Sequence, residues 1–509
     1  MSARDEVDLL IIGGGINGVG IARDAAGRGL SVLLCEQGDL GGATSSASTK
    51  LIHGGLRYLE HYEFRLVRES LREREILLDL APHIVRPMRF VLAHNKNQRP
   101  AWMIRIGLFI YDHLGGRKKL AGSHGISFRK HPSGRSLNTE FDKGFIYSDC
   151  CVDDARLVIL NAMSAREIGA EILTHTKCTE AKRDNGQWQV TLSATSKHGA
   201  DRDVTAKVLI NAAGPWVGEV LNEPLSLQNP HSLRRVKGSH IVVPQLFDHE
   251  FAYIFQNPDN RIVFAIPYEN NFTLIGTTDV DYDGDPMQAQ ASEEEVAYLC
   301  EAVSRYFKTP VKTTDVVWSY SGVRPLFGEV ENEASGLSRD YLLDIDIEND
   351  VPVLSVFGGK ITTYRKLAEQ VLKKLRPWLP EQQPPWTEQG SLPGGDIENN
   401  HFEAFLNEIL GQYPWMPTAL LNRYARAYGT RIHKILNNAS SLQDLGVHLG
   451  DLLYEAEVRY LSAEEWARTA EDILWRRTKL GLHVTPETVE NLETWMTTHF
   501  ENSTQGTTA

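Results

Sequence analysis

The chain has 509 residues, 42% of them hydrophobic, and a formal net charge of −13 at pH 7. This length and composition exclude a disordered protein and predict about two to four folding units, at roughly 150 residues per domain. The acidic balance argues against a general nucleic-acid binder, because a phosphate backbone is repelled unless basic residues gather locally. The five cysteines form no Cys-x-x-Cys pair, which predicts a reducing compartment and no disulfide framework.

The first 37 residues predict a dinucleotide-binding β-α-β unit. A short, continuously apolar strand at 9–12 leads through a glycine turn at 13–18 into a helix that ends near residue 28. A second apolar strand follows at 31–35. The turn has the spacing Gly-x-Gly-x-x-Gly, which is weak evidence alone but stronger with two strands and a helix in register around it.

The residues of this unit have separate roles in such a site. Gly13 permits the tight turn, Gly15 lets a pyrophosphate approach backbone N–H groups at the helix N-terminus, and Gly18 allows close helix–strand packing. Glu36 lies 18 residues after Gly18 and can accept hydrogen bonds from ribose hydroxyls while disfavouring a 2′-phosphate. The unit therefore predicts FAD or NAD rather than NADP, and leaves the choice between FAD and NAD open.

The segment that follows favours FAD. Residues 41–48 are rich in Gly, Ser and Thr, which suits a loop that lines a diphosphate and sugar chain with hydroxyl and backbone donors. A nicotinamide domain normally proceeds to its next β-α-β unit instead. A helix and alternating strands follow at 157–192, and a buried strand at 207–211 returns toward the cofactor, where Ala212 to Gly214 can press their backbone against it.

The second half of the chain changes in character twice. Residues 232–345 are rich in strand patterns, and 354–375 predict a strand, a glycine turn and a helix. Residues 377–395 are rich in Pro and Gly, cannot form regular helix or sheet, and are interpreted as a linker. Helical patterns dominate from 399 to about 500, where Ser462 before Glu465 predicts a capping box.

A series of motifs resembles the FAD-dependent, quinone-linked respiratory glycerol-3-phosphate dehydrogenases, in the order of that family. The motifs are IIGGGINGVGIARDAAGRGL, ATSSASTKLIHGGLRYLE, NAAGPW, KGSHIVVP, IGTTDVDYDGDP, YSGVRPL, SVFGGKITTYRKLAE and EDILWRRTKLGL. The resemblance covers nearly the whole chain. It implies an α/β fold, in which a doubly wound, Rossmann-like FAD-binding domain of the D-amino-acid-oxidase type is joined by a discontinuous, strand-rich substrate domain and an α-helical C-terminal domain.

The domains implied by the resemblance are discontinuous in sequence. The FAD-dependent oxidoreductase region is expected at 1–382, with FAD-binding parts at about 1–75, 146–231 and 346–382 and the substrate domain at about 76–145 and 232–345. The linker is expected at 383–397 and the C-terminal helical domain at 398–509.

The resemblance implies FAD as the cofactor and assigns its contacts along the chain. The expected cofactor-binding residues are Gly13, Gly15, Gly18, Glu36, Thr44, Ser45, Ser46, Ser48, Leu51, His53, Ala212, Gly214, Gly359, Lys360 and Thr362. Lys360 and Thr362 are expected beside the flavin ring, where a cation favours the reduced anion. The alternative for the FGGK motif is a glycine loop at a helix start, with no role for its lysine.

Glycerol 3-phosphate is a dianion near neutral pH, so its site needs fixed positive charge, and the planar guanidinium of arginine suits phosphate best. The resemblance implies Arg57 and Arg324 as phosphate-binding residues, with Tyr58 beside Arg57. For each arginine the alternative is a surface or ion-paired residue.

The oxidation also needs a group that takes the proton of the substrate hydroxyl. His240 has the most suitable ordinary pKa for this base, while Arg324 and Lys360 can stabilise developing negative charge. The expected catalytic residues are thus His240, Arg324 and Lys360, and all three are also expected to bind substrate with Arg57 and Tyr58. The alternative for His240 is a satisfied histidine in the core.

Asp279 to Gln290 matches the first half of a calcium-binding loop, Asp-x-Asp-x-Asp-Gly. The twelfth position is Gln290 in place of a bidentate glutamate, and Pro286 interrupts the loop. The segment therefore predicts an acidic turn at a strand end, and no metal is expected.

Arg99 to Leu120 combines an apolar, aromatic stretch with a basic end. The apolar part is too short to span a bilayer, so the segment predicts an anchor on the membrane surface, through Trp102, Arg105, Phe109, Lys118 and Lys119. The alternative is a core helix with a solvated basic end. The WRRTK segment at 475–479 is a second basic cluster, with packing between domains as its alternative.

These features predict an enzyme that oxidises sn-glycerol 3-phosphate to dihydroxyacetone phosphate and passes electrons from FAD to ubiquinone or another quinone. The expected partners include membrane-surface lipids but no nucleic acid, and a homodimer is left open. The expected location is the cytoplasm, attached peripherally to the cytoplasmic face of the inner (plasma) membrane. The alternatives are an FAD-dependent oxidase that acts on an amino acid or another hydroxy substrate with oxygen, and a flavin-bearing scaffold without activity.

Overall fold

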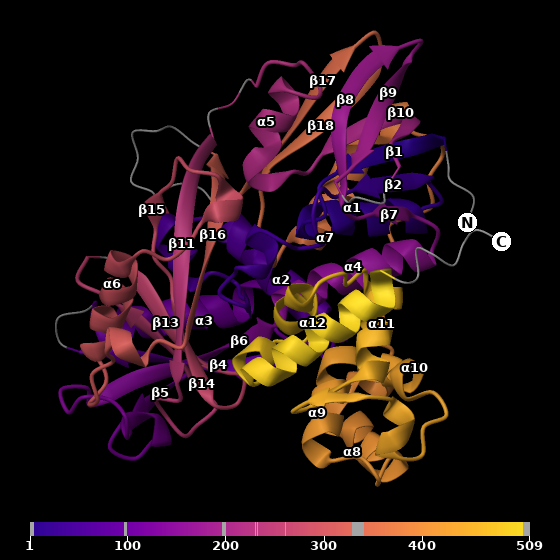
Figure 1. Cartoon of the computed structure of the whole chain (residues 1–509). Coiled ribbons are helices and arrows are strands. Elements are labelled where there is room, and N and C mark those ends of the chain that lie inside the picture. The colour runs from indigo at the N-terminus through magenta and orange to yellow at the C-terminus, as the bar shows by residue number, and fades with distance from the viewer. Residues whose placement is uncertain are drawn as a thin grey trace.

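The computed structural model of the chain describes residues 5–95, 99–195, 200–229, 231, 233–259, 261–327 and 340–501. Over these residues the chain forms two large β-sheets, each covered by helices, and a helical C-terminal domain (Figure 1). Sheet A carries the N-terminal strand, sheet B lies beside it, and the C-terminal helices lie below sheet A and to the right of the lower part of sheet B in the view of Figure 1.

Sheet A has eight strands within the described residues. Its parallel centre runs in the order β18 (Val351–Gly358), β10 (Arg202–Asn211), β1 (Glu6–Ile12), β2 (Val32–Cys35) and β7 (Glu171–Leu173). Antiparallel strands complete the sheet: β17 (Tyr341–Glu348) beside β18, β9 (Gln187–Ala194) beside the first half of β10, and β8 (Thr176–Asp184) beside β9.

The apolar run of β1 is explained by burial on both faces of sheet A. Leu9 and Ile11 join one apolar cluster, while Val7, Leu10 and Ile12 join the cluster on the opposite face. Helices α1 (Ile16–Gly27), α4 (Asp154–Glu167) and α7 (Tyr364–Leu375) cover the first face, with α1 packed against both others. Helix α5 (Val217–Asn222) and strands β8 and β9 cover the second. The expected doubly wound domain is present.

Sheet B has ten strands within the described residues and is antiparallel except for the pair β12–β4. Its order is β15 (Val280–Asp281), β11 (Leu233–Pro244), β14 (Phe272–Gly276), β13 (Ile262–Tyr268), β12 (Ala252–Gln256), β4 (Val85–His94), β6 (Lys143–Val152) and β3 (Leu51–Ile52). Strand β16 (Trp318–Phe327) pairs with β11, and β5 (His124–Ser127) pairs with β6.

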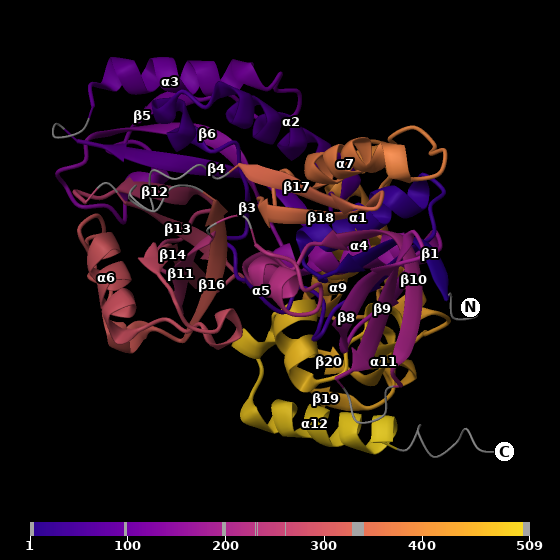
Figure 2. The same ribbon diagram turned by 90° about the horizontal axis from the view of Figure 1, so that it is seen from above.

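Side chains alternate between the two faces of sheet B, as the period of a strand requires. Ile241 and Val243 pack toward α6 (Glu293–Ser304), whereas Val242 packs toward α2 (Phe64–Leu80) and α3 (Ala101–Leu114). Figure 2 shows α3 at the outer edge of the molecule, over β5 and β6. The exposed position of α3 contradicts the alternative of a core helix.

The sheet boundaries fall elsewhere than the boundaries expected from the sequence. Residue 146 lies inside β6, a strand of sheet B that leads directly into α4 beside sheet A, and residue 346 lies inside β17 of sheet A. Strand β3, within the segment expected to bind FAD, also belongs to sheet B. The crossing from β6 into α4 has no Pro or Gly, whereas the crossing from β2 to β3 passes Gly38, Gly41 and Gly42, so Pro and Gly content alone does not mark the sheet boundaries.

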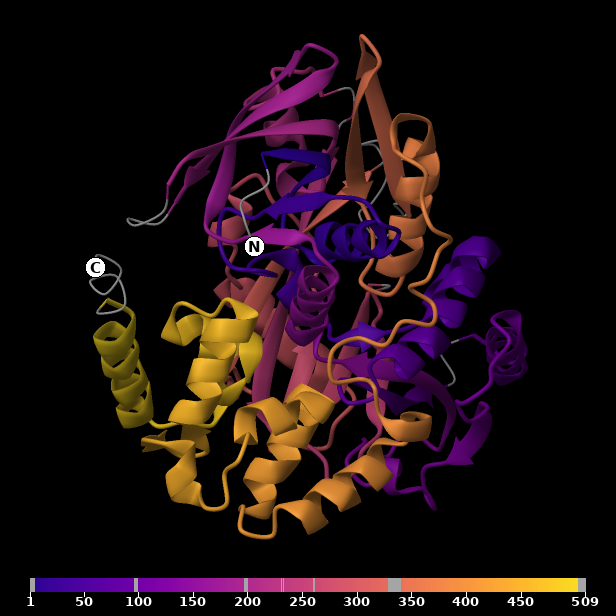
Figure 3. The same ribbon diagram turned by 90° about the vertical axis from the view of Figure 1, so that its right-hand side faces the viewer.

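The linker carries no helix or strand from Leu379 to Ile397, yet it is packed against the body of the protein. The guanidinium of Arg23 lies 4.7 Å from the centroid of the Trp386 ring, and the Trp386 indole donates to the carbonyl oxygen of Asp24 at 3.3 Å. Figure 3 shows the linker running from α7 past α2 to the C-terminal helices, and the amide of Leu392 donates to Leu80 in α2 at 2.9 Å.

The C-terminal domain is helical apart from one small hairpin. It comprises α8 (Phe402–Gln412), α9 (Thr418–Tyr428), α10 (Ile432–Leu436), β19 (His448–Gly450), β20 (Leu453–Tyr454), α11 (Glu455–Glu465), the π-helical turn η12 (Asp472–Arg477) and α12 (Pro486–Glu501). The predicted capping box at Ser462 is wrong, because Ser462 lies inside α11 and Glu465 instead accepts a hydrogen bond from Arg156 at 2.9 Å.

One apolar cluster runs through both halves of the molecule. Leu9 of sheet A and Leu367 of α7 belong to the same cluster as Leu420, Tyr424 and Trp495 of the C-terminal domain. The C-terminal domain therefore shares its core with the FAD-binding side of sheet A.

His83 lies at the junction of these parts, against Gly394 of the linker and Gly429 after α9. Its imidazole is buried, and neither ring nitrogen has a hydrogen-bond partner among the described residues. Burial and the charges of Arg156 and Arg426 lower the pKa of His83 to about 3. The unfolded chain binds this proton near pH 6.5, so between these values stability falls as the pH decreases.

We therefore expect the free energy of unfolding of the wild-type protein to fall by about 2 kcal/mol more than that of His83→Asn between pH 7.5 and pH 5. Denaturant unfolding at several pH values measures the difference. His448→Asn, at an exposed position of the C-terminal domain, should keep the wild-type slope. Parallel slopes for the wild type and His83→Asn would contradict the expectation.

Candidate active site

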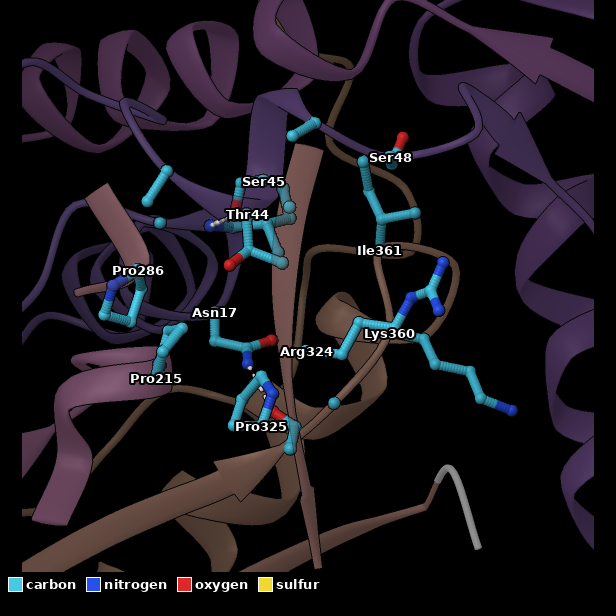
Figure 4. A pocket seen from close by; sticks show the side chains of 18 of the residues that line it. Asn17, Thr44, Ser45, Ser48, Pro215, Pro286, Arg324, Pro325, Lys360 and Ile361 are labelled. Carbon is cyan, nitrogen blue, oxygen red and sulfur yellow. Dashed lines mark hydrogen bonds between the residues drawn. The ribbon is translucent and has the colours of Figure 1, made fainter. Parts of the chain in front are cut away.

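A pocket of about 860 Å³ is lined by residues of both sheets. The C-terminal ends of β1, β10 and β18 reach it from sheet A, where open α/β sheets place their ligands. Strands β4, β6, β13 and β16 contribute the wall from sheet B. Ligand pockets span roughly 300–1,000 Å³, so this one suits a large cofactor. In Figure 4, Asn17, Thr44 and Ser45 lie on one side of the pocket, and Arg324 and Lys360 on the other.

The glycine turn presses the start of α1 against the end of β10. Gly13 has φ +113°, and a Cβ there would lie 2.6 Å from the carbonyl oxygen of Ala212. A Cβ on Gly18 would lie 1.9 Å from the carbonyl oxygen of Gly13, so Gly18 supports the turn from beneath and is not among the residues lining the pocket. Gly15 caps α1 without a side chain, which leaves the helix N-terminus open to an anion.

The acid at the end of β2 is held in place by backbone amides. One carboxylate oxygen of Glu36 accepts from the amide of Gly14 at 2.7 Å, and the other accepts from the amide of Gly38 at 2.8 Å. Burial raises the pKa of Glu36, although these two amides act in the opposite direction. Each oxygen keeps a further lone pair for a ribose hydroxyl.

The hydroxyls of the loop at 41–48 point mainly into the protein, contrary to the expectation that they donate to a ligand. Thr44 donates to the carbonyl oxygen of Val323 at 2.7 Å, Ser46 to that of Ala43 at 3.2 Å, and Ser48 to a carboxylate oxygen of Asp154 at 2.7 Å. Ser46 does not line the pocket as described. These bonds fix the shape of the loop, because a hydroxyl has a single proton to donate.

Ser45 differs from its neighbours in the loop. Its Oγ accepts from the amide of Ile16 at the N-terminus of α1, at 3.0 Å, and so keeps its own proton for the pocket. Thr44, Ser45 and Ser48 all line the pocket.

The far end of the pocket is formed by the loop after β18. Gly358 and Gly359 have positive φ values, and Asn17 of α1 donates to the carbonyl oxygen of Gly358 at 3.2 Å. The ammonium of Lys360 lies 3.9 Å from the centroid of the Tyr58 ring. Among the residues expected to bind the cofactor, the pocket lining includes Gly13, Gly15, Glu36, Thr44, Ser45, Ser48, Leu51, His53, Ala212, Gly214, Gly359, Lys360 and Thr362.

Arg324 is oriented by three neighbours. It forms an ion pair with Asp279 and donates to the hydroxyl of Thr277 at 3.0 Å. Its guanidinium lies over Gly238, where a Cβ would come within 2.4 Å of it. The absence of a side chain at Gly238 therefore makes room for this orientation. Asp279 also lines the pocket and was missed by the sequence reasoning, which placed it only in the acidic turn.

Arg57 differs from Arg324. Its side chain lines the pocket and makes no hydrogen bond or ion pair with any residue that the structure describes. The positive charge of Arg57 is thus available to a ligand in the pocket.

His240 does not line the pocket in the described part of the chain, contrary to the expected direct contact with substrate. It is fully buried in β11, where Gly276 leaves room for its ring. Its Nε2 lies 2.9 Å from the hydroxyl oxygen of Thr49, and Thr49 does line the pocket. Burial, with the charges of Arg324 and Lys50, holds the pKa of His240 well below its usual value. Thr49 was also missed, although it directly follows the predicted loop.

Two acids of the Asp279 to Gln290 segment form ion pairs. Asp279 pairs with Arg324, and the second carboxylate oxygen of Asp281 accepts from Arg234 at 2.8 Å. Within the described ranges, no group of three His, Cys, Asp or Glu side chains could hold a metal ion.

The sequence was compared with protein families and with known proteins. Residues 8–343 match the FAD dependent oxidoreductase family, and residues 385–502 match the C-terminal domain of alpha-glycerophosphate oxidase. A glycerol-3-phosphate dehydrogenase of Pseudomonas aeruginosa is 54% identical over 94% of this chain and 93% of its own length. The aerobic glycerol-3-phosphate dehydrogenase of Escherichia coli K12 is 50% identical over 96% of this chain and 97% of its own length.

The chain belongs to the family of FAD-dependent glycerol-3-phosphate dehydrogenases. Another relative, the D-erythritol 1-phosphate dehydrogenase of Brucella abortus, is 51% identical over 95% of this chain and 96% of its own length. Among solved structures, the glycerol-3-phosphate dehydrogenase of Bacillus halodurans complexed with FAD superposes with a TM-score of 0.79, at 27% identity, over 97% of this chain and 91% of that chain. The expected fold class and the expected cofactor are confirmed.

The pocket of this chain fits FAD at its nucleotide end. The side-chain-free turn at Gly13, the open N-terminus of α1 and the carboxylate of Glu36 are the features that a dinucleotide requires. These residues would hold the diphosphate and the adenosine ribose.

We expect Gly13→Ala to lower the affinity for FAD by on the order of 10- to 100-fold, because a Cβ at this φ is strained and meets the Ala212 carbonyl. The absorbance ratio of flavin to protein after purification, and titration of the apoprotein with FAD, measure the loss. Gly411→Ala on α8, where a Cβ meets nothing within 4 Å, is the control. A Gly13→Ala protein with full flavin content would rule out this role of the turn.

Proposed function

We propose that the protein oxidises sn-glycerol 3-phosphate to dihydroxyacetone phosphate, with FAD as the hydride acceptor, and passes the electrons to a membrane quinone. The observation that carries the substrate is the presence of Arg57, Arg324 and Lys360 among the basic residues that line the pocket. The names of the relatives that are 50–54% identical support the same substrate.

Phosphate binding follows from how these cations are held. The chain as a whole is acidic, so an anion enters only where cations gather. Arg324 is fixed in orientation by Asp279 and Thr277, while Arg57 contributes a charge that no described acid neutralises. A planar guanidinium can donate two parallel hydrogen bonds to a phosphate group. Arg57 is therefore assigned as the main phosphate-binding residue, with Arg324 and Lys360 supporting it and Tyr58 beneath Lys360.

The hydroxyl proton of the substrate needs an acceptor while FAD, when bound, takes a hydride from the same carbon. The Thr49 hydroxyl stands between the pocket and Nε2 of His240, 2.9 Å from that nitrogen. Because its pKa is held low, His240 is neutral, and its Nε2 can accept a hydrogen bond from Thr49 that orients this hydroxyl beside the pocket. Arg324 and Lys360 line the same pocket, where positive charge favours the ionised alcohol.

Membrane attachment is supported by the outer face of α3. Trp102 is 63% exposed, Ile106 52% and Phe109 56%, whereas Leu108 and Tyr111 on the other face are buried. Such a face suits insertion at the level of the lipid headgroups. No helix in the part of the chain that the structure describes could cross a bilayer. We assign α3 as a peripheral anchor on the cytoplasmic face of the inner (plasma) membrane.

The basic residues expected in this anchor are engaged to different degrees. Arg105 donates to the hydroxyl of Ser123 at 2.8 Å, and the side chain of Lys119 pairs with Asp79, while Lys118 is exposed. The aromatic face thus provides the more direct contact with lipid, and Lys118 adds attraction to anionic headgroups.

A quinone acceptor is favoured by an apolar connection between α3 and the pocket. Phe90, Ile254 and Phe264 line the pocket and belong to the same apolar cluster as Leu108 and Tyr111 of α3. A lipid-soluble acceptor would meet apolar side chains between α3 and the pocket. A water-soluble acceptor would not need such an apolar surface.

A second candidate substrate is D-erythritol 1-phosphate, because the Brucella abortus relative with that name is as similar as the others. Both substrates pair a terminal phosphate with a secondary alcohol, so the same cations serve either. Initial rates with the two phosphates, measured side by side, distinguish the candidates.

The function is tested by adding glycerol 3-phosphate to the yellow protein without oxygen. Bleaching of the flavin, followed by reoxidation with a short-chain ubiquinone, is the expected result. Release of hydrogen peroxide in air at the rate of dye reduction would favour an oxidase instead, and a flavin indifferent to the substrate would refute the proposal.

We expect Arg57→Met to lower kcat/KM for glycerol 3-phosphate by on the order of 10- to 100-fold, because a charge-assisted hydrogen bond is lost. The flavin content should remain that of the wild type. Arg68→Met, at an exposed position on α2, is the matched control. Unchanged kinetics of Arg57→Met would contradict the phosphate assignment.

We expect the double variant Trp102→Ser, Phe109→Ser to bind anionic vesicles at least about tenfold more weakly, because the two largest exposed side chains of α3 are lost. Dye-coupled activity should be unaffected. Ile347→Ser with Val447→Ser removes exposed apolar side chains elsewhere and serves as the control for vesicle sedimentation. Unaltered sedimentation of the α3 variant would place the anchor elsewhere.

A further inference from the structure

The C-terminal domain meets the active-site pocket through the π-helical turn η12, which contains Trp475 and Arg477. Turns of π-helix are rare and occur often at functional sites. Two side chains of η12 are directed to two different parts of the pocket wall. Arg477 contacts Asp39 in the loop between β2 and β3, here called the cofactor loop, and Trp475 contacts Trp318 in β16, the strand that pairs with β11 beside His240.

At the cofactor loop, Asp39 is held by two arginines of η12. Arg477 donates to both carboxylate oxygens of Asp39, each at 2.7 Å, and Arg476 donates to one of them at 2.6 Å. Arg477 is fully buried and also donates to the carbonyl oxygen of Glu465 at the end of α11. Although burial opposes it, these arginines lower the pKa of Asp39, which keeps the carboxylate charged.

Asp39 connects the two parts of the expected cofactor site. It lines the pocket three residues after Glu36, and its carbonyl oxygen accepts from the amide of Gly42 at the start of the hydroxyl-rich loop. The amide of Gly41 donates to Gly14 in the glycine turn at 3.0 Å. A displacement of Asp39 would therefore move both the ribose-binding acid and the loop of Ser45.

At the substrate side, aromatic rings form a stack from the C-terminal domain to His240. The ring of Trp475 lies 4.4 Å from that of Trp318, which lies 4.9 Å from Tyr320. Tyr320 stacks on His240 with centroids 4.8 Å apart and planes 11° apart. The Tyr320 hydroxyl also donates to the carbonyl oxygen of Ser48 at 2.8 Å, next to Thr49. The stack thus supports both members of the Thr49–His240 pair.

Further buried charges fix the same junction. Arg156 of α4 pairs with Glu465, both almost fully buried, and Lys50 pairs with Asp154 at 2.9 Å behind the pocket. Loss of either partner of a buried ion pair leaves an uncompensated charge, so the two partners are held together.

We propose that η12 makes the C-terminal domain a positioning element of the active site, with two separable effects. Arg477, through Asp39, holds the cofactor loop and so sets the affinity for FAD. Trp475, through Trp318 and Tyr320, holds His240 and so sets the rate at which substrate reduces the flavin. The second effect rests on the proposed function, whereas the first does not.

The first effect is tested on the full-length apoprotein by titration with FAD. Arg477→Met should raise the Kd for FAD about 10- to 100-fold, and Arg477→Lys, which keeps the charge but not the two-pronged contact, should recover part of it. Asp39→Asn should show the same loss, and the double variant should lose no more than either single one. Arg459→Met, on the exposed side of α11, is the control.

A Kd for FAD within twofold of the wild type in Asp39→Asn would overturn this effect, even if Arg477→Met failed to fold. The Kd for FAD is measured without substrate, so an unchanged Kd would refute only this effect. The proposed oxidation is tested separately, by bleaching of the wild-type flavin with glycerol 3-phosphate.

The second effect is tested by stopped-flow reduction of the flavin with glycerol 3-phosphate. Trp475→Leu should lower the limiting rate about tenfold, with the Kd for FAD and the Kd for substrate within twofold of the wild type, since one stacked pair is lost. Trp475→Phe should restore most of the rate. Trp415→Leu, a half-buried tryptophan of the same domain, is the control for a general loss of packing. A wild-type rate in Trp475→Leu, or a loss equal to that of Trp415→Leu, would overturn the assignment.

Discussion

The close contact of three backbone segments at Gly13, Gly18 and Ala212 is the constraint on which the site is built. A Cβ at Gly13 or Gly18 would overlap a neighbouring carbonyl oxygen, so only glycine allows β1, α1 and β10 to approach this closely. The contact fixes the N-terminus of α1 at the end of the parallel strands. Glu36 and Ser45 then reach that point through single hydrogen bonds to Gly14 and Ile16.

The distribution of charge around the pocket complements this frame. In a chain with a net charge of −13, Arg324 is paired with Asp279 and Arg57 is left without an acidic partner among the described residues. The pairing gives Arg324 a fixed direction over Gly238, and the unpaired Arg57 gives the pocket its attraction for anions. Arg324 thus supplies a fixed orientation and Arg57 supplies the uncompensated charge. A single ion-paired arginine could not supply both.

The sequence was most informative where a backbone requirement leaves few residue types. The dinucleotide site was predicted from the glycine spacing, the apolar strands of sheet A and Glu36. Local backbone geometry determines which residue types can occupy these positions. The directions of the Thr44, Ser46 and Ser48 hydroxyls depend on Val323, Ala43 and Asp154, and no local pattern shows them. His240 was expected in the pocket but lies behind Thr49, because the pairing of β11 with β14 and β16 decides where its ring points. The WRRTK segment reads as a basic patch, yet Arg477 is buried on Asp39, 438 residues away in sequence.

The apolar cluster shared by sheet A and the C-terminal helices has a consequence for how such a protein can evolve. Two separate family models describe residues 8–343 and 385–502, which invites the view of two exchangeable modules. Leu9 and Trp495 nevertheless belong to one core, and Trp386 of the linker is packed on Arg23. A recombination event within the linker would expose the hydrophobic surface of each module. It would also leave the buried carboxylate of Asp39 without Arg476 and Arg477. In this chain the two modules therefore depend on each other, and exchange of either one would require substitutions that reseal each surface.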